Sequence, residues 1–216
     1  LDGLIKELKK AKVLAFDTET DSLDFTQANL VGLSVATDED NSYYIPVGHD
    51  YEGAPKQLDR DEVLKKLKPI IEKTPLIGQH LKFDRNVLAN YDIHLNAIEN
   101  DTMLMSYVYD PTATRHNLDA MASHYLNVKT TTFEDVAGKG VKQLTFNQIP
   151  LERASDYAAE DADITFRCYS HLKPALAKTP SLEKVLHEIE LPLVPVLSDM
   201  EQAGTCLLYT SDAADE

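Results

Sequence analysis

The chain has 216 residues, of which 36 are Asp or Glu and 21 are Lys or Arg, so its formal net charge is −15. This length is enough for one sizeable domain with a well-buried core. The negative charge excludes a domain that grips duplex nucleic acid through a basic surface, and no apolar run in the sequence is long enough to indicate a membrane span. Because the chain begins with Leu1, we expect it to be part of a longer protein.

The first 80 residues alternate between apolar runs and turn-rich linkers. The predicted elements are a helix at 1–11, strands at 13–18, 30–37 and 42–47, a helix at 59–73 and a strand at 75–78. The linkers between the first three strands are short, which is typical of hairpins and predicts an antiparallel start to the sheet. Asp59 is expected to cap the N-terminus of the helix that follows it.

Residues 79–91 carry the chain from the fourth strand into a helix, and from residue 100 onward the pattern is helical almost throughout. The predicted helices are 79–91, 102–109, 117–126, 133–137, 151–177 and 181–203. Pro192 and Pro195 are expected to kink or delimit the last helix. Strands followed by helices favour an α/β fold over an all-helical one.

The first strand runs directly into two acidic residues, Asp17 and Glu19. Side chains alternate along a strand, so these two should share one face, while Phe16 and Thr18 point the other way. Two like charges this close repel each other, and a bound cation is the simplest way to stabilise them. Taken alone, such a pair also fits a solvated strand end.

Three further polar residues are candidates for the same site, although each of them taken alone also fits an ordinary structural role. Asp84 lies where the fourth strand passes into a helix, a position that also suits a helix cap. Tyr157 and Asp161 are four residues apart on the helix at 151–177, so they share a face. Their order along the chain, after the acidic pair, is more specific than any of them alone.

Three motifs carry a resemblance to a known family: FDTET at 16–20, GQHLKFD at 78–84 and YAAEDAD at 157–163. They closely resemble the motifs of the proofreading 3′-5′ exonuclease domain of bacterial DNA polymerase I, within the tyrosine subgroup of the four-carboxylate exonucleases. The segments NLVGLS, TFEDVAGKG and LTFNQI also look like this family. The resemblance implies an α/β, ribonuclease H-like mixed sheet, antiparallel in its first strands and then parallel, flanked by helices.

The resemblance also implies a division of the chain. Residues 1–178 would form the exonuclease domain, and 179–204 a helix leading into a polymerase domain that this chain lacks. Residues 205–216 do not continue the family pattern, and we interpret them as a non-native tail. His80 stands where the family usually has Asn, which leaves one polar contact near the substrate uncertain.

By resemblance, four carboxylates would bind two divalent metal ions. Asp17, Glu19 and Asp161 would hold the ion that activates water, and Asp17 and Asp84 the ion beside the leaving 3′ oxygen. Hard cations take oxygen ligands, so Mg²⁺ is expected, with Mn²⁺ or Zn²⁺ as substitutes. Tyr157 would orient the attacking water, since a phenol that titrates near pH 10 is a poor base at neutral pH.

The family also suggests residues that contact the substrate. Leu23 and Phe133 would lie against the terminal bases, and Gln79, His80 and Arg115 are candidates for sugar or phosphate contacts. From the residues alone, Leu23 and Phe133 also fit core positions, and Arg115 also fits an ordinary surface charge.

The predicted function is a metal-dependent 3′-5′ exonuclease that releases 5′-monophosphates from single-stranded or frayed DNA 3′ ends during proofreading. The alternatives are RNA trimming, as in ribonuclease D, and a non-catalytic scaffold that supports a polymerase. The expected partners are a single-stranded DNA 3′ end and the polymerase domain of the same full-length chain. We expect a monomer, not bound to a membrane, in the bacterial cytoplasm at the nucleoid.

Overall fold

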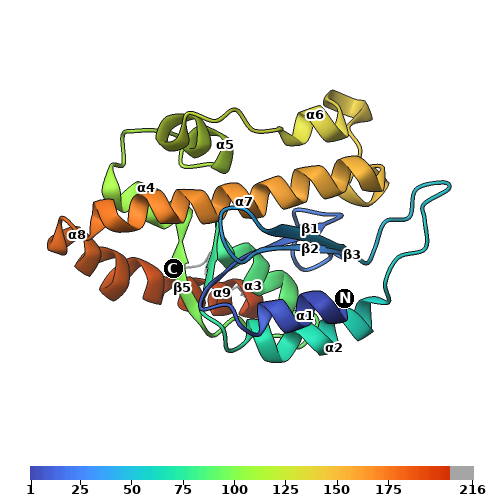
Figure 1. Ribbon diagram of the computed structural model, residues 1–216, viewed down its shortest axis with the longest axis horizontal. Helices are drawn as coiled ribbons and strands as arrows, with labels where there is room; N and C mark the ends of the chain where they lie inside the picture. The colour runs from blue at the N-terminus through green and yellow to red at the C-terminus, as the bar shows by residue number, and fades with distance from the viewer. Residues whose placement is uncertain (205–216) are drawn as a thin grey trace, which may run out of the picture.

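Five strands form one mixed sheet in the computed structural model, which describes residues 1–204. The strands are β1 (Leu14–Thr20), β2 (Leu30–Ala36), β3 (Ser42–Pro46), β4 (Leu76–Gly78) and β5 (Ile98–Asp101). Helices cover both faces of this sheet (Figure 1). The expectation for residues 205–216 lies outside the described residues.

The sheet has the strand order β3-β2-β1-β4-β5. β1 pairs antiparallel with β2, and β2 with β3, whereas β1 pairs parallel with β4, and β4 with β5. The predicted change from antiparallel to parallel pairing is therefore confirmed. The sequence did not predict β5, because this short edge strand is polar at Glu99, Asn100 and Asp101 and lacks an apolar alternation.

One face of the sheet is covered by α1 (Asp2–Leu8), α2 (Arg60–Ile71), α3 (Leu81–Ala89) and α9 (Leu191–Ala203). Leu67 and Ile71 of α2 are fully buried against this face, which explains the helical spacing of apolar residues in that segment. Asp59 caps α2 as predicted, because its side chain accepts a hydrogen bond of 2.9 Å from the amide of Glu62.

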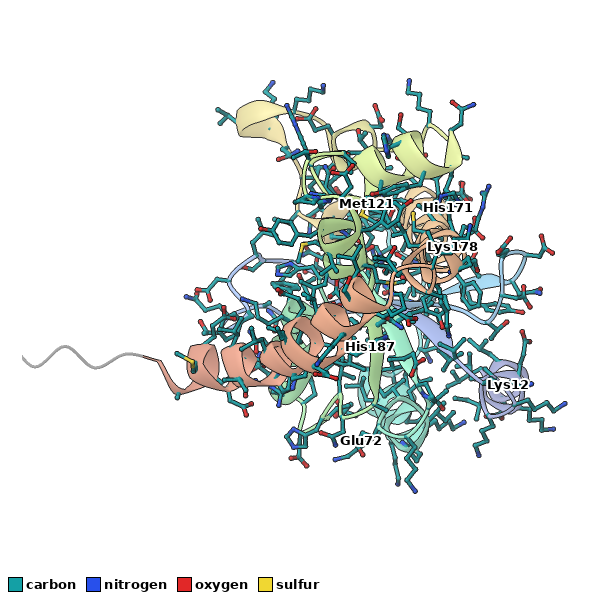
Figure 2. The ribbon with its side chains drawn as sticks, turned by 90° about the vertical axis from the view of Figure 1, so that its left-hand side faces the viewer. Lys12, Glu72, Met121, His171, Lys178 and His187 are labelled. Atoms are coloured by element: carbon teal, nitrogen blue, oxygen red, sulfur yellow. The ribbon has the colours of Figure 1, made fainter. Side chains whose placement is uncertain are left out.

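The opposite face is covered mainly by one long helix, α7 (Leu151–Leu176), with α4 (Thr102–Tyr109) and α5 (Leu118–Met121) packed beside it. Figure 2 shows both layers from the side: Met121 and His171 lie on the α7 side, and Lys12 and Glu72 on the other. Smaller elements complete this side of the molecule: η1 (Ala122–Leu126), α6 (Phe133–Ala137), η2 (Gly140–Lys142) and η3 (Phe146–Gln148).

The C-terminal helical region is broken, as its prolines predicted. It comprises α8 (Pro180–Val185), a π-helical turn η4 (Leu186–Glu190), and α9. Pro192 lies at the start of α9, where backbone amides have no hydrogen-bond partner within the helix, so its lack of an N–H group removes no helical hydrogen bond. Pro195 lies inside the helix. Within residues 1–204, none of the helices is both long enough and apolar enough to cross a membrane.

Candidate active site

Alternation along β1 decides which side chains face α7. Leu14 and Phe16 belong to the core beneath α1, α2 and α3, whereas Ala15 belongs to the core beneath α7. Asp17 and Glu19 continue the register of Ala15, so the strand directs them toward α7. The two carboxylates therefore share a face, as predicted.

Thr18 points the other way and connects β1 to α3. Its backbone amide and its hydroxyl both donate hydrogen bonds to Oδ1 of Asp84, at 2.8 Å and 2.6 Å. Asp84 lies in the first turn of α3 and is only 2% exposed. Both bonds from Thr18 go to the same oxygen, so they fix the carboxylate while leaving Oδ2 to another partner.

The predicted catalytic residues line two adjoining cavities at this end of the sheet. The larger, of about 660 Å³, is lined by Asp17, Glu19, Tyr157 and Asp161. The smaller, of about 320 Å³, is lined by Asp17 and Asp84. Asp17 lies on the wall between the two, so all four carboxylates can reach one continuous cleft.

Burial and mutual repulsion both favour the protonated forms of these carboxyl groups. Burial raises the pKa of Asp17 and of Glu19 well above the ordinary range, and the charges of their acidic neighbours add to the effect. Burial raises the pKa of Asp84 and of Asp161 to about 7, against the hydrogen bonds from Thr18 and Tyr157 that lower it.

Within the described part of the chain, no Lys or Arg side chain pairs with this cluster. No salt bridge within residues 1–204 joins a Lys or Arg to Asp17, Glu19, Asp84 or Asp161. Oε1 of Glu19 is buried without any hydrogen-bond partner. A buried acceptor with no donor is costly, so the arrangement calls for an external cation.

The four carboxylates are not already closed around one point. In the described part of the chain, no three His, Cys, Asp or Glu side chains form a ready-made ligand set for a metal ion. Oxygen ligands with an orphaned acceptor among them nevertheless fit a hard divalent cation.

Tyr157 projects from α7 beside Asp161. Burial raises the pKa of Tyr157, with the charges of Asp161 and Glu19 adding to it, so the phenol keeps its proton at neutral pH. Phe133 and Phe146 hold the ring, with centroids 6.2 Å and 6.0 Å away. The phenolic hydrogen is donated to Asp161, so Tyr157 can hold a water molecule through its oxygen, but it cannot act as a base.

A supporting layer behind Glu19 was missed by the sequence analysis. Nδ1 of His49 lies 3.1 Å from the carbonyl oxygen of Ile149, which can only accept, so Nδ1 carries the hydrogen and Nε2 accepts from the hydroxyl of Tyr44 at 2.7 Å. The ring of Tyr44 fills the space over Gly32, the strand partner of Glu19. A Cβ at Gly32 would overlap this ring, and the glycine inside a strand was the available signal.

Asp101 at the end of β5 was also missed. Its carboxylate is 1% exposed and accepts backbone hydrogen bonds from His80 (3.2 Å), Leu81 (2.7 Å), Met103 (3.0 Å) and Leu104 (3.3 Å). One buried carboxylate thus caps both α3 and α4. It also supports the turn before α3, in which His80 adopts a left-handed conformation with φ 65°. The only sequence signal was an Asp directly before a predicted helix.

We expect Asp101→Asn to lower the free energy of unfolding by about 1 to 3 kcal/mol, because the NH2 group of Asn would replace Oδ2 and cannot accept from the buried backbone amide of Leu81. Urea unfolding checks this value. Asp110→Asn is the matched control, since Asp110 is exposed and binds only a local turn through Thr112. If Asp101→Asn and the protein without substitutions unfold at the same urea concentration, Asp101 does not stabilise the two helix starts as proposed.

The predicted base contacts lie at the rim and wall of the larger cavity. Leu23 is 93% exposed, which excludes the core position that the sequence left open for it. Phe133 is half-buried against Tyr157. Phe83 and Leu144 line the same cavity and were not singled out from the sequence.

The predicted polar contacts are arranged differently from one another. His80 is exposed and lines the smaller cavity together with Gln79. The side-chain amide of Gln79 is already engaged, because it donates to the carbonyl of His116 at 2.8 Å and accepts from Thr102 at 2.6 Å. Arg115 is exposed and lies outside the lining of both cavities. It precedes His116, whose backbone carbonyl accepts the hydrogen bond from Gln79.

Relatives of this chain are found among bacterial DNA polymerases. DNA polymerase I of Pseudomonas aeruginosa is 53% identical over 207 residues, which cover 94% of this chain and 23% of the relative. DNA polymerase I of Borreliella burgdorferi is 39% identical over 211 residues, covering 96% and 22%. The chain thus spans less than a quarter of the length of these relatives.

Solved structures share the fold at low sequence identity. The POL domain of Pol1 from M. smegmatis, in complex with DNA primer-template and dNTP, superposes with a TM-score of 0.71 at 19% identity and covers 96% of this chain and 31% of that one. Brucella melitensis NrnC gives a TM-score of 0.66 at 19% identity and covers 95% and 93%. These neighbours agree with the predicted ribonuclease H-like fold.

A family model described as 3′-5′ exonuclease matches residues 1–177. This matched range contains the whole sheet, α3 and α7, and therefore every residue of the cleft described above. The resemblance seen in the sequence motifs is confirmed, and the chain belongs to the 3′-5′ exonuclease family.

Proposed function

We propose that this domain is the metal-dependent proofreading exonuclease of a DNA polymerase I. It hydrolyses the terminal phosphodiester of single-stranded or frayed DNA 3′ ends and releases 5′-monophosphates. The observation that carries the proposal is the meeting of four carboxylates and a protonated Tyr157 in one cleft, from three separate parts of the chain. Family membership and the polymerase relatives support it.

Two divalent ions, with Mg²⁺ as the proposed occupant and Mn²⁺ or Zn²⁺ as substitutes, would be held by Asp17, Glu19, Asp84 and Asp161. Brucella melitensis NrnC, which shares the fold, is described with bound Mg²⁺. When bound, such ions supply an activated water, neutralise the phosphate charge and stabilise the leaving alkoxide. The orphaned Oε1 of Glu19 and the second oxygen of Asp84 are the acceptors that best suit them.

The protein residues hold and orient the reacting groups. Tyr157, whose phenolic hydrogen is donated to Asp161, accepts a hydrogen bond from the attacking water and so orients a lone pair of that water toward the phosphorus. Thr18 holds the carboxylate of Asp84 in place, and the layer of Tyr44 and His49 closes the space behind Glu19. Each of these contacts restricts the motion of a side chain or of the attacking water before the reaction begins.

The apolar wall of the cleft suits a DNA end whose bases are unpaired. Phe83 and Phe133 offer aromatic surfaces against which bases can stack, and Leu23 and Leu144 add apolar contact surface. Base stacking on aromatic side chains is worth about 1 to 3 kcal/mol per base and needs no basic groove. An acidic domain can therefore bind a short single strand through stacking and through metal-bound phosphate.

We expect Leu23→Ala to raise KM for a single-stranded DNA oligonucleotide about tenfold, with a smaller change in kcat, because one contact surface for the terminal bases is lost. Steady-state kinetics with a labelled oligonucleotide measure both constants. Leu58→Ala is the matched control, since Leu58 is a comparable exposed Leu, 44% accessible, that lines neither cavity. An unchanged KM for Leu23→Ala would show that Leu23 does not contact substrate.

Digestion of DNA and RNA oligonucleotides of matched sequence tests the substrate class. The proposal predicts faster shortening of DNA. Faster degradation of RNA would contradict a proofreading role and would favour trimming of the ribonuclease D type. If neither DNA nor RNA is degraded under conditions in which the metal is bound, the scaffold alternative is favoured.

The proposal extends to the organisation of the full-length protein. Residues 1–178 are the exonuclease domain, and 179–204 lead toward a polymerase domain in the same chain. That domain and a single-stranded 3′ end are the proposed partners. The domain acts as a monomer in the bacterial cytoplasm at the nucleoid, where primer ends are found. Sedimentation of the isolated domain tests the monomer.

A further inference from the structure

α9 lies alongside α3 on the sheet face opposite α7 (Figure 1). The contact between these two helices is polar at its centre, although it is shielded from solvent. Ser198 of α9 is fully buried and Asn86 of α3 is 1% exposed. Buried polar side chains of this kind fix one arrangement of two helices, because any shift leaves hydrogen-bonding groups without partners.

The hydroxyl of Ser198 uses its full hydrogen-bonding capacity. It donates to Oδ1 of Asn86 at 2.5 Å, and it accepts from the guanidinium of Arg85 and from Nε2 of Gln202 at 3.0 Å. Asn86 in turn accepts from Gln202 at 3.1 Å and donates to Oε2 of Glu201 at 2.8 Å. Two α3 residues and three α9 residues form one connected network.

Two ion pairs extend this network to the edge of the interface. Lys82 pairs with Oε1 of Glu201 at 2.5 Å, and Arg85 pairs with Oδ1 of Asp199 at 2.8 Å. Lys82 and Arg85 stand on either side of Asp84 in the sequence. The α3 turn that carries Asp84 is therefore held by α9 at residues before and after the carboxylate.

The helical repeat places these groups on different sides of α3. Successive residues turn by about 100° around a helix axis, so Asn86 and Lys82 lie roughly opposite Asp84. Asp84 faces Thr18 and the cleft, while Asn86 faces Ser198. Rotation or sliding of α3 against α9 would therefore displace Asp84 from the cleft.

We propose that α9 is a positioning element for the exonuclease site: its polar contacts with α3 set the place of the Asp84 carboxylate. The proposal rests on the proposed function of Asp84 as a metal ligand. Thr18 and α9 hold α3 from its two sides. Ser198, Asn86 and Glu201 act through Asp84 and do not touch the reacting atoms.

The experiment uses the 216-residue chain with Ser198→Ala and measures Mn²⁺ binding by calorimetry together with oligonucleotide hydrolysis. We expect Mn²⁺ affinity to fall about fivefold and kcat about tenfold, with KM for the oligonucleotide unchanged. Val196→Ala is the matched control, because Val196 lies on the same helix and is 51% exposed. It should match the unchanged protein in both measurements.

A double-mutant cycle with Asp84→Asn separates positioning from general loss of stability. If Ser198 acts through Asp84, then Ser198→Ala should cause no further loss of Mn²⁺ affinity when Asp84 is already replaced. The same loss in both backgrounds, or an unchanged Mn²⁺ affinity for Ser198→Ala alone, would overturn the proposal.

Glu201→Gln supplies the same test in a milder form if Ser198→Ala does not fold, since it removes only the ion pair with Lys82. A loss of Mn²⁺ affinity that disappears in the Asp84→Asn background would again support positioning, and no loss would refute it. If the protein without substitutions binds Mn²⁺ but cleaves no DNA, the proposed function is refuted. The positioning proposal would still be tested by the Mn²⁺ affinities.

Discussion

Asp17→Ala is expected to reduce hydrolysis of a single-stranded DNA 3′ end by about 10³-fold or more, which corresponds to about 4 kcal/mol of transition-state stabilisation. Asp17 lines both cavities of the cleft, so its loss removes a ligand from both proposed ion sites. The fold should remain intact, because removing one of several neighbouring like charges relieves repulsion. Single-turnover kinetics and circular dichroism measure the two effects.

The replacement has a close control on α7. Asp161→Ala should behave like Asp17→Ala, whereas Asp156→Ala, which removes an exposed acid from the same helix, should keep full activity. Unfolding of Asp17→Ala would point to a structural role for this carboxylate. Full activity in Asp17→Ala would show that the assigned ligand set is wrong.

The metal-free protein is expected to lose several kcal/mol of stability between about pH 4 and pH 7. The folded pKa of Asp84 and of Asp161 is about 7, raised from an ordinary value of 3.8. A carboxyl group with a raised folded pKa stabilises the fold fully below its unfolded pKa, and this contribution is lost as pH rises toward the folded pKa. Each unit of difference corresponds to about 1.4 kcal/mol.

Bound metal should remove this dependence. A divalent cation binds the ionised carboxylates, so stability at pH 8 should recover when Mn²⁺ is added. Urea unfolding in EDTA at pH 5 and pH 8, and then with Mn²⁺ at pH 8, makes the comparison. Asp84→Asn should reduce the pH dependence in EDTA, while the part that Asp161 contributes remains. Greater stability at pH 8 than at pH 5 without metal would contradict the electrostatic description of the cleft.

Much of the scaffold could be predicted from local patterns. The run before Asp17 identified β1, and strand alternation placed Asp17 and Glu19 on one face. Helical spacing placed Tyr157 and Asp161 together on α7. These features depend on residues close in sequence, which is why the sequence revealed them.

Features that depend on distant contacts were not predictable in the same way. β5 is polar and exists because it pairs with β4 at the sheet edge, and Asp101 gains its role only when that pairing brings it beneath α3. The hydrogen bonds from Thr18 to Asp84 join residues 66 positions apart. Likewise, Ser198 reads as an ordinary helix residue until α9 packs against α3.

The most direct test of the exonuclease assignment is a gel assay of this domain with a single-stranded DNA oligonucleotide labelled at its 5′ end, first with Mg²⁺ and then with EDTA. The proposed function predicts a ladder of products that shorten stepwise from the 3′ end with Mg²⁺ and no products with EDTA. Equal cleavage in EDTA, release of the label as a mononucleotide from the 5′ end, or no cleavage by protein that calorimetry shows to be metal-bound would contradict it.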